Sequence, residues 1–288
     1  MTYNEIKKAL VDAGIGDNNE CRREAMLICE RFASIPAGEL PFRQNEDIPS
    51  PEIETALRRR LRREPLQYIL GEWEFYGLNF SLTPDCLIPR PDTELTVEAA
   101  IERLPRGACF ADIGTGSGAI AVSILHARPD THCYAVDISR GALDTATANA
   151  ERLGVGDRFH PILTDIFEGQ LGKLMPTRPD ALISNPPYIP SGELLSGIIQ
   201  PELEFEPRAA LDGGADGLDF YRYIIPNSPS LLSPDGMLIF EVGIGEAGDV
   251  CSLGAACGYS GQILRDLGGI ERTVILTKQS DRSRPSQI

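Results

Sequence analysis

The residues best placed for chemistry form the tetrapeptide Asn185-Pro186-Pro187-Tyr188, which directly follows an apolar run at 181–184. Two consecutive prolines stiffen the backbone and remove two N–H donors, so neighbouring carbonyl groups stay free to accept hydrogen bonds. The side-chain oxygen of Asn185 and the carbonyl of Pro186 can each accept one N–H of a planar NH2 group, while Tyr188 stacks on its plane. The tetrapeptide therefore predicts catalysis by orientation of an amide or amine nitrogen. We expect Asn185, Pro186 and Tyr188 to be catalytic and all four residues to contact the substrate.

A second cluster is the glycine-rich stretch 112–118, which lies between an apolar strand pattern and an apolar helix pattern. Glycines there allow a tight turn and a close approach of the backbone to a ligand. Asp137 ends the next predicted strand, where an acid can hydrogen-bond ribose hydroxyls. The order of strand, loop, helix, strand and acid predicts a nucleoside site. Its expected residues are Asp112, Gly114, Thr115, Gly116, Ser117, Gly118 and Asp137.

The identity of the nucleoside depends on the residue before the glycines. The pattern Gly-x-Gly-x-x-Ala also suits a dinucleotide. Asp112 favours S-adenosylmethionine, because an acid at this position can meet the amino group of that ligand but would repel a pyrophosphate. S-adenosylmethionine brings an activated methyl group, so transfer to the held nitrogen needs neither a metal nor a covalent intermediate. We expect no metal site, since the seven cysteines and three histidines lack metal-binding spacing.

The elements that must position these residues alternate between strand and helix beyond Pro91. Such alternation predicts an α/β fold with a doubly wound, Rossmann-like sheet and right-handed crossovers. The predicted strands are 109–113, 132–137, 159–163, 181–184, 237–242 and 272–277, and the predicted helices are 119–127, 140–153, 217–232 and 247–257.

The region before the sheet has a different pattern. Its first part has the apolar spacing of helices, and Ser50-Pro51 predicts the start of a third helix. Aromatic and β-branched residues around two glycines at 67–83 then predict a hairpin. We therefore expect a small N-terminal helical domain for substrate recognition at 1–66, a β-hairpin linker at 67–84 and the catalytic domain at 85–288.

The charge of the chain bears on its partners. The net charge is −15, from 27 basic and 42 acidic residues, and the part after Leu70 carries −14 of it. A protein that grips duplex DNA should show a basic face, because phosphate neutralisation dominates such binding. The sequence also lacks an apolar run of about 20 residues, a signal-peptide core and paired cysteine motifs. We therefore expect a cytoplasmic protein with no membrane contact and no direct nucleic-acid partner.

Five arginines at 58–63 form the densest basic cluster. Such a run most often makes a solvated helix face. The alternative is a docking surface for an acidic or ribonucleoprotein partner.

Together these motifs resemble those of the release factor glutamine methyltransferases, and the likeness covers nearly the whole chain. The similar stretches are 65–71, 75–77, 87–94, 112–118, Asp137, 185–188 and parts of 206–222.

The resemblance implies a seven-stranded methyltransferase sheet that binds S-adenosylmethionine. Methyl transfer would go to the side-chain amide nitrogen (N5) of the glutamine in the Gly-Gly-Gln loop of peptide-chain release factors. Asn185 would then touch both cofactor and substrate. Phe167, where many relatives have tryptophan, would line the cofactor pocket, with ordinary core packing as the alternative. Arg90 and Thr93 are substrate-side candidates that could instead anchor the linker.

Two downstream stretches stay open. Glu206-Pro207-Arg208 follows a long loop that is either a lid over the glutamine or a surface loop. The stretch 241–246 ends in an acid, Glu246, where the family often has glutamine, and we assign it no role.

Two rival functions remain to be weighed. The tetrapeptide suits the exocyclic amine of adenine equally well, so an adenine N6 methyltransferase acting on DNA or RNA is the first alternative. That enzyme must extrude its base and hold the backbone with basic residues, which the acidic catalytic half disfavours. A non-catalytic cofactor-binding module is the second alternative, and it would leave the tetrapeptide idle. We expect the enzyme to be a monomer.

Overall fold

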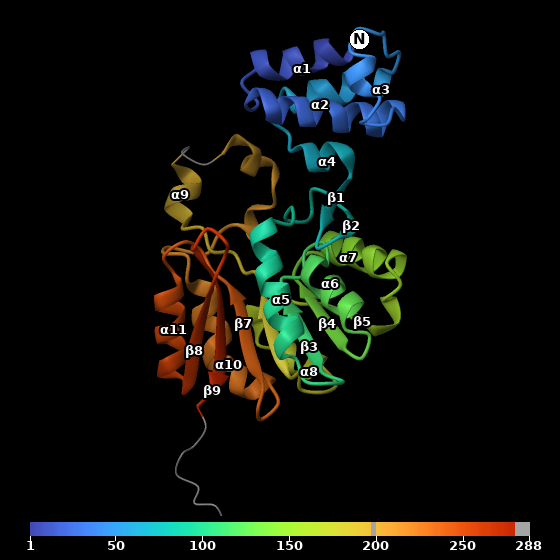
Figure 1. Ribbon diagram of the computed structural model, residues 1–288. Coiled ribbons are helices and arrows are strands. Elements are labelled where there is room, and N and C mark those ends of the chain that lie inside the picture. Colours follow the sequence, from blue (N-terminus) through green and yellow to red (C-terminus); the bar gives the residue numbers. More distant parts are fainter. Residues whose placement is uncertain (197–199, 280–288) are drawn as a thin grey trace, which may run out of the picture. The chain divides into compact units, whose positions relative to one another are not determined.

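The computed structural model describes residues 1–196 and 200–279, which fall into two compact units (Figure 1). We call residues 1–73 together with 200–205 the helical unit, and the other described residues the sheet unit. The short segment 200–205 thus belongs with the N-terminal helices, although it follows the tetrapeptide 185–188 in the sequence.

The helices of the helical unit begin at residues suited to capping. Thr2 and Glu5 form a reciprocal capping box at the first helix, and Asp17 and Glu20 form another at the second. Ser50 caps the third helix, as predicted. The elements are α1 (Tyr3–Asp12), α2 (Asn18–Ala33), η1 (Leu40–Phe42), α3 (Pro51–Arg60), α4 (Leu66–Leu70) and η5 (Pro201–Phe205).

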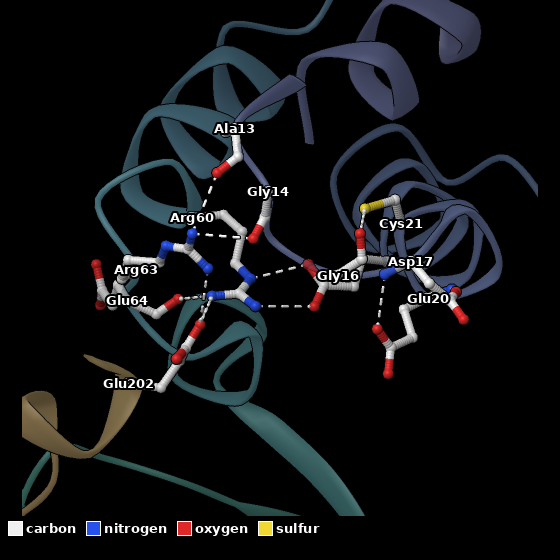
Figure 2. A network of polar contacts seen from close by, with 11 residues as sticks. Ala13, Gly14, Gly16, Asp17, Glu20, Cys21, Arg60, Arg63, Glu64 and Glu202 are labelled. Carbon is white, nitrogen blue, oxygen red and sulfur yellow. Dashed lines mark hydrogen bonds and ion pairs between the residues drawn. The ribbon is translucent and has the colours of Figure 1, made fainter. Parts of the chain in front are cut away.

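The arginine-rich stretch of the helical unit is not a uniformly solvated face. The side chain of Arg60 is 7% exposed and pairs with Glu24 at 2.8 Å and with Glu202 at 3.1 Å. Arg63 donates to two backbone carbonyls just beyond α1 (Figure 2). The expectation of a solvated face is therefore wrong for Arg60, which ties η5 to α2 and α3.

A two-stranded sheet, formed by β1 (Glu72–Phe75) and β2 (Leu78–Ser81), follows the helices. The first residues of the predicted hairpin instead form α4, whose apolar side chains are buried. Gly71 ends α4 in the left-handed conformation, at φ 76°, which favours glycine. The two strands within the predicted hairpin region thus begin at residue 72.

The sheet unit contains a seven-stranded sheet with the order β5-β4-β3-β6-β7-β9-β8. Its strands run parallel except β9, which is antiparallel to both neighbours. The six predicted strands lie within two residues of their expected ends, but the sequence analysis does not place β8, most of whose side chains are exposed or half-buried. The strands are β3 (Cys109–Ile113), β4 (His132–Asp137), β5 (Phe159–Leu163), β6 (Ala181–Ser184), β7 (Met237–Glu241), β8 (Tyr259–Arg265) and β9 (Glu271–Lys278).

Helices flank this sheet (Figure 1). Helices α5, α6 and α7 pack in sequence against one another, and α10 packs against α8 and α11. No helix within the described residues is both long enough and apolar enough to cross a bilayer. The helical segments are η2 (Pro91–Thr93), α5 (Glu94–Arg103), α6 (Ala119–Ala127), α7 (Arg140–Arg152), η3 (Gly156–Arg158), η4 (Ile166–Glu168), α8 (Leu171–Leu174), α9 (Ser191–Leu195), η6 (Arg208–Ala210), α10 (Asp219–Leu231) and α11 (Ala247–Ala256).

The strand order explains why the chemistry-bearing residues meet. From β3 the chain continues outward to β4 and β5, and it then returns to place β6 on the other side of β3. Ligands of doubly wound sheets bind beyond the carboxyl ends of the strands at such a reversal. The glycine loop follows β3, Asp137 ends β4 and Asn185 follows β6, so all three lie at this edge.

Candidate active site

The glycine loop between β3 and α6 has the conformation that its glycines allow. Gly116 has φ 57° and Gly118 has φ 81°, both in the left-handed region. A Cβ atom at Gly116 would meet no heavy atom within 4 Å, whereas one at Gly118 would lie 3.2 Å from the Ala146 side chain. Gly116 thus leaves open space for a ligand, and Gly118 permits the close packing of α6 against α7.

Asp112 stabilises this loop from the interior of the protein. The residue is fully buried, and its Oδ2 accepts hydrogen bonds from the Thr115 hydroxyl at 2.7 Å and the Ala121 N–H at 3.2 Å. Burial raises the pKa of the Asp112 carboxyl to about 7. Its Oδ1 has no hydrogen-bond partner among the residues that the structure describes. Asp112 therefore fixes the loop and keeps one oxygen unpaired.

Asp137 faces the loop from the end of β4. Its Oδ2 accepts the Gly116 N–H and its Oδ1 accepts the Ser139 N–H, both at 2.9 Å. Burial raises the pKa of the Asp137 carboxyl above its ordinary value. Two backbone hydrogen bonds thus hold the carboxylate in place at the end of β4.

A cavity of about 230 Å³, partly open to solvent, joins these parts. Its wall is largely apolar, with Leu87, Ile113 and Ile138 among the lining side chains. Of the residues predicted for the site, it is lined by Gly114, Gly116, Asp137, Phe167, Asn185, Pro186 and Pro187. The predicted residues outside its lining are Asp112, Thr115, Ser117, Gly118, Tyr188, Arg90 and Thr93.

Phe167 projects into this cavity more than into the core. Its side chain is 46% exposed. Its ring lies 4.8 Å from the ring of Tyr223 and 5.2 Å from that of Phe220, between centroids. An exposed aromatic ring held by two others offers a flat apolar surface to a ligand, so the geometry fits cofactor contact better than core packing.

The tetrapeptide presents one unpaired acceptor. Asn185 donates from Nδ2 to the Thr93 hydroxyl at 3.2 Å, while its Oδ1 is buried without a hydrogen-bond partner in the described part of the chain. A buried acceptor without a partner is unfavourable, and it becomes favourable when a ligand supplies an N–H. Burial raises the pKa of the Tyr188 phenol well above its usual range, so this ring stays neutral. These features fit a site for a planar NH2 group.

A downstream segment that received no role in the sequence analysis supports the tetrapeptide. The Ile189 N–H donates to the Leu211 carbonyl at 3.0 Å, and the Gly213 N–H donates to the Ile189 carbonyl at 2.9 Å. A Cβ atom at Gly213 would lie 2.7 Å from Cα of Tyr188, closer than such atoms approach. The double glycine at 213–214 is the sequence signal that could have indicated this contact.

Arg90 is placed as an anchor by the structure. It pairs with Glu206, whose other carboxylate oxygen accepts the Ile88 N–H at 3.1 Å. Glu206 is 6% exposed, and the next residue, Pro207, lines the cavity. Pro207 therefore forms part of the cavity wall. Part of the loop before it, residues 197–199, lies outside the described residues.

Two acids at the same sheet edge were not assigned roles. Glu241 ends β7, is 2% exposed, and has a pKa raised to about 7 by burial. Glu246 is half-buried, accepts the Gly243 N–H at 3.0 Å, and also has a pKa raised to about 7 by burial. In residues 1–196 and 200–279, no group of three or more histidine, cysteine, aspartate or glutamate side chains could hold a metal ion.

Known proteins share both the sequence and the fold. A family model described as the methyltransferase small domain matches residues 93–204, and one described as the PrmC N-terminal domain matches residues 2–71. A release factor glutamine methyltransferase from Geobacter sulfurreducens is 48% identical over 219 residues, which are 75% of this chain and 74% of that protein. The protein of the same name from Neisseria gonorrhoeae is 38% identical over 92% of this chain and 96% of its own length. A solved methyltransferase from Pyrococcus furiosus has a TM-score of 0.53 at 17% identity, and the match covers 72% of this chain and 91% of that one.

Proposed function

This chain belongs to the release factor glutamine methyltransferases, and we propose that it methylates the side-chain amide nitrogen (N5) of the glutamine in the Gly-Gly-Gln motif of peptide-chain release factors. The enzyme is an S-adenosylmethionine-dependent methyltransferase with an α/β fold. The observation that supports the proposal most directly is the buried oxygen of Asn185, which has no partner among the described residues and lies beside the glycine-loop cavity.

S-adenosylmethionine supplies an activated methyl group on a sulfonium centre. For its binding we propose Asp137 at the ribose, the backbone of Gly114 and Gly116 at the open loop, and Phe167 at the adenine. Thr115, Ser117 and Gly118 shape the loop behind this surface. Asp112 fixes Thr115 through Oδ2, and its unpaired Oδ1 is the proposed partner of the amino group of the cofactor.

The tetrapeptide is proposed to orient the glutamine. An amide nitrogen is a weak nucleophile because its lone pair is delocalised into the carbonyl. Oδ1 of Asn185 and the carbonyl of Pro186 accept its two N–H groups, and Tyr188 and Pro187 restrict the plane of the amide. The lone pair then points toward the methyl group, so that catalysis comes from positioning and fixed dipoles.

The three parts of the chain are proposed to have different roles. We assign substrate recognition to the helical domain at 1–66, the linker role to 67–84 and methyl transfer to 85–288. Arg90 and Thr93 act beside the substrate by holding the wall and the tetrapeptide. A release factor as substrate implies a cytoplasmic enzyme, and we propose a monomer that needs no nucleic acid.

The test is transfer of radiolabelled methyl groups by the purified enzyme. We expect label in a purified release factor and in no equimolar DNA or RNA. A release factor with alanine in place of the glutamine of its Gly-Gly-Gln motif is the control and should stay unlabelled. Label in nucleic acid alone would support the adenine N6 alternative, which membership of this family disfavours.

A further inference from the structure

The amide of Asn185 has to be held in one of two orientations. Its two ends are nearly equal in shape, but the NH2 group only donates hydrogen bonds and the oxygen only accepts them. The Asn185 side chain can accept an N–H of the glutamine only if its oxygen faces that group. Something in the protein must therefore prevent the amide from turning over.

The strand register brings an unassigned acid beside this amide. Strands β6 and β7 are parallel neighbours, and Ser184 pairs with Phe240. The next residues along each strand are Asn185 and Glu241. The side chains of Thr93 and Asn185 lie near the Glu241 carboxylate and lower its pKa, as hydrogen-bond donors do, while its Oε2 is buried without a partner among the described residues.

From these contacts we propose that Glu241 and Thr93 are positioning residues that fix the amide of Asn185 with its oxygen toward the substrate. Nδ2 of Asn185 donates to the Thr93 hydroxyl at 3.2 Å, which leaves the single hydrogen of that hydroxyl to point toward the Glu241 carboxylate. Turning the amide over would place its oxygen against a carboxylate and leave the NH2 group in the cavity. This inference rests on the proposed role of Asn185 as the acceptor of the glutamine amide.

The environment of Glu241 favours this role. Thr93 is 4% exposed and Glu241 is 2% exposed, so water does not compete with their hydrogen bonds. Charged and titratable groups around the carboxyl are Asp92, Arg272, Tyr188 and Tyr221. Since burial outweighs the favourable partners and raises the pKa of Glu241 to about 7, the carboxyl loses its charge on mild acidification. The protonated acid accepts less strongly, and the orientation of Asn185 is then weakened.

The test compares four substitutions at two positions. For Glu241→Ala and Thr93→Val we expect kcat for release factor methylation to fall by about 10- to 100-fold. Thr93→Ser keeps the hydroxyl and should retain most of the activity. The dissociation constant for S-adenosylmethionine, measured by calorimetry, should change by less than about 3-fold in each variant, because no lost contact touches the cofactor loop. In Glu241→Gln, the fall of kcat on acidification near pH 7 should disappear, since glutamine does not titrate.

A double-mutant cycle separates positioning from a merely structural role. If Thr93 and Glu241 act through Asn185, adding Thr93→Val or Glu241→Ala to Asn185→Ala should slow the enzyme no further. Additive losses of kcat, or a parallel loss of cofactor affinity and thermal stability, would overturn the proposal. Glu246→Gln is the matched control for the pH profile. It removes another acid with a pKa of about 7 at the same edge and should keep the acidic limb.

A measurement without substrate keeps the inference distinct from the proposed function. The side-chain NH2 resonances of Asn185, observed by NMR, should titrate near pH 7 in the wild type and stay constant in Glu241→Gln. If they titrate while the wild type fails to label release factors, the proposed substrate is wrong but the contact stands. If they do not titrate, the positioning role is wrong whatever the substrate.

Discussion

At the residue scale, the chemistry depends on which polar atoms stay unpaired. Several side chains around the glycine loop already have partners, including both oxygens of Asp137. Oδ1 of Asn185 and Oδ1 of Asp112 are exceptions among the described residues, and each lies beside the cavity or its loop. These two oxygens therefore indicate that a ligand of the site should supply an N–H or O–H donor to each.

Replacing Asn185 by alanine tests the substrate side. Asn185→Ala removes one of two acceptors for the glutamine amide, so we expect kcat to fall by about 100-fold or more, comparable to the loss of one oriented dipole in other enzymes. Cofactor affinity should stay within a few-fold of the wild-type value by calorimetry. Equal losses of turnover and affinity would show that Asn185 mainly serves the cofactor or the fold.

Replacing Asp137 tests the cofactor side. Asp137→Ala removes the carboxylate expected at the ribose, and the dissociation constant for S-adenosylmethionine should rise by about 10- to 100-fold, as for loss of charged hydrogen bonds. Asp144→Ala on α7 is the control, because Asp144 is exposed and lies outside the cavity lining. Unchanged affinity in Asp137→Ala would rule out the ribose role.

The site residues differ in how far the sequence could predict them. Asn185, Asp137 and the glycine loop were predictable because each directly follows or ends a strand of recognisable pattern. The contacts of Glu241 and Thr93 with Asn185 were not, because they depend on the register of β6 against β7 and on a segment far away in the sequence. Phe167 needed the structure to choose between core and cavity.

At the element scale, the tetrapeptide keeps its shape through close packing against the segment at 211–214. Gly213→Ala should force apart backbone atoms, since its Cβ would lie 2.7 Å from Cα of Tyr188 and 2.8 Å from the Pro187 carbonyl oxygen. We expect kcat to fall by about 10-fold or more, since small displacements of the oriented groups are costly.

A matched substitution controls for the loss of a glycine. A Cβ atom at Gly192 would meet no heavy atom within 4 Å, and neither glycine has a positive φ. Gly192→Ala should therefore retain wild-type turnover in the same methylation assay. Similar turnover in both variants would mean that the tetrapeptide tolerates displacement, and catalysis would then not depend on its rigidity.

The strands and helices of the sheet unit followed from the sequence where apolar patterns were continuous, as in β3 and β6, whose side chains are buried on both faces. The strand β8 was not predicted, because most of its side chains are exposed or half-buried and its sequence therefore lacks the pattern of a buried face. Helix α4 was predicted as part of a hairpin, because its aromatic and β-branched residues resemble a strand. The segment forms a helix instead of a strand because the helix buries Leu66, Ile69 and Leu70 in the core.

At the scale of the whole molecule, a segment that follows the tetrapeptide belongs to the helical unit. Glu202 in η5 reaches Arg60 in α3 (Figure 2). Arg60 also pairs with Glu24 in α2. This network of nearly buried charges could not be predicted, because the sequence shows only a run of arginines. Through it, Arg60 links α2, α3 and η5 of the helical unit.

Removing Arg60 should therefore destabilise the helical unit. Arg60→Ala leaves the partly buried carboxylates of Glu24 and Glu202 without their cation, and we expect a loss of about 3 kcal/mol in the free energy of unfolding. Trp73 is the only tryptophan of the chain and packs against the core of this unit, so its fluorescence during urea unfolding reports the change.

The control lies on the same helix. Arg58 is exposed, and Arg58→Ala should change the free energy of unfolding by less than about 0.5 kcal/mol. Equal unfolding curves for the Arg60→Ala and Arg58→Ala variants would contradict the structural role assigned to Arg60.

A crystal structure of the enzyme with S-adenosylhomocysteine and a release factor domain containing the Gly-Gly-Gln motif would show directly how the glutamine is held. The account predicts that the glutamine side-chain nitrogen lies within hydrogen-bonding distance of both Oδ1 of Asn185 and the Pro186 carbonyl, on the side of the cavity that faces the cofactor sulfur. A glutamine bound elsewhere, or an Asn185 amide with its NH2 group toward the substrate, would contradict it.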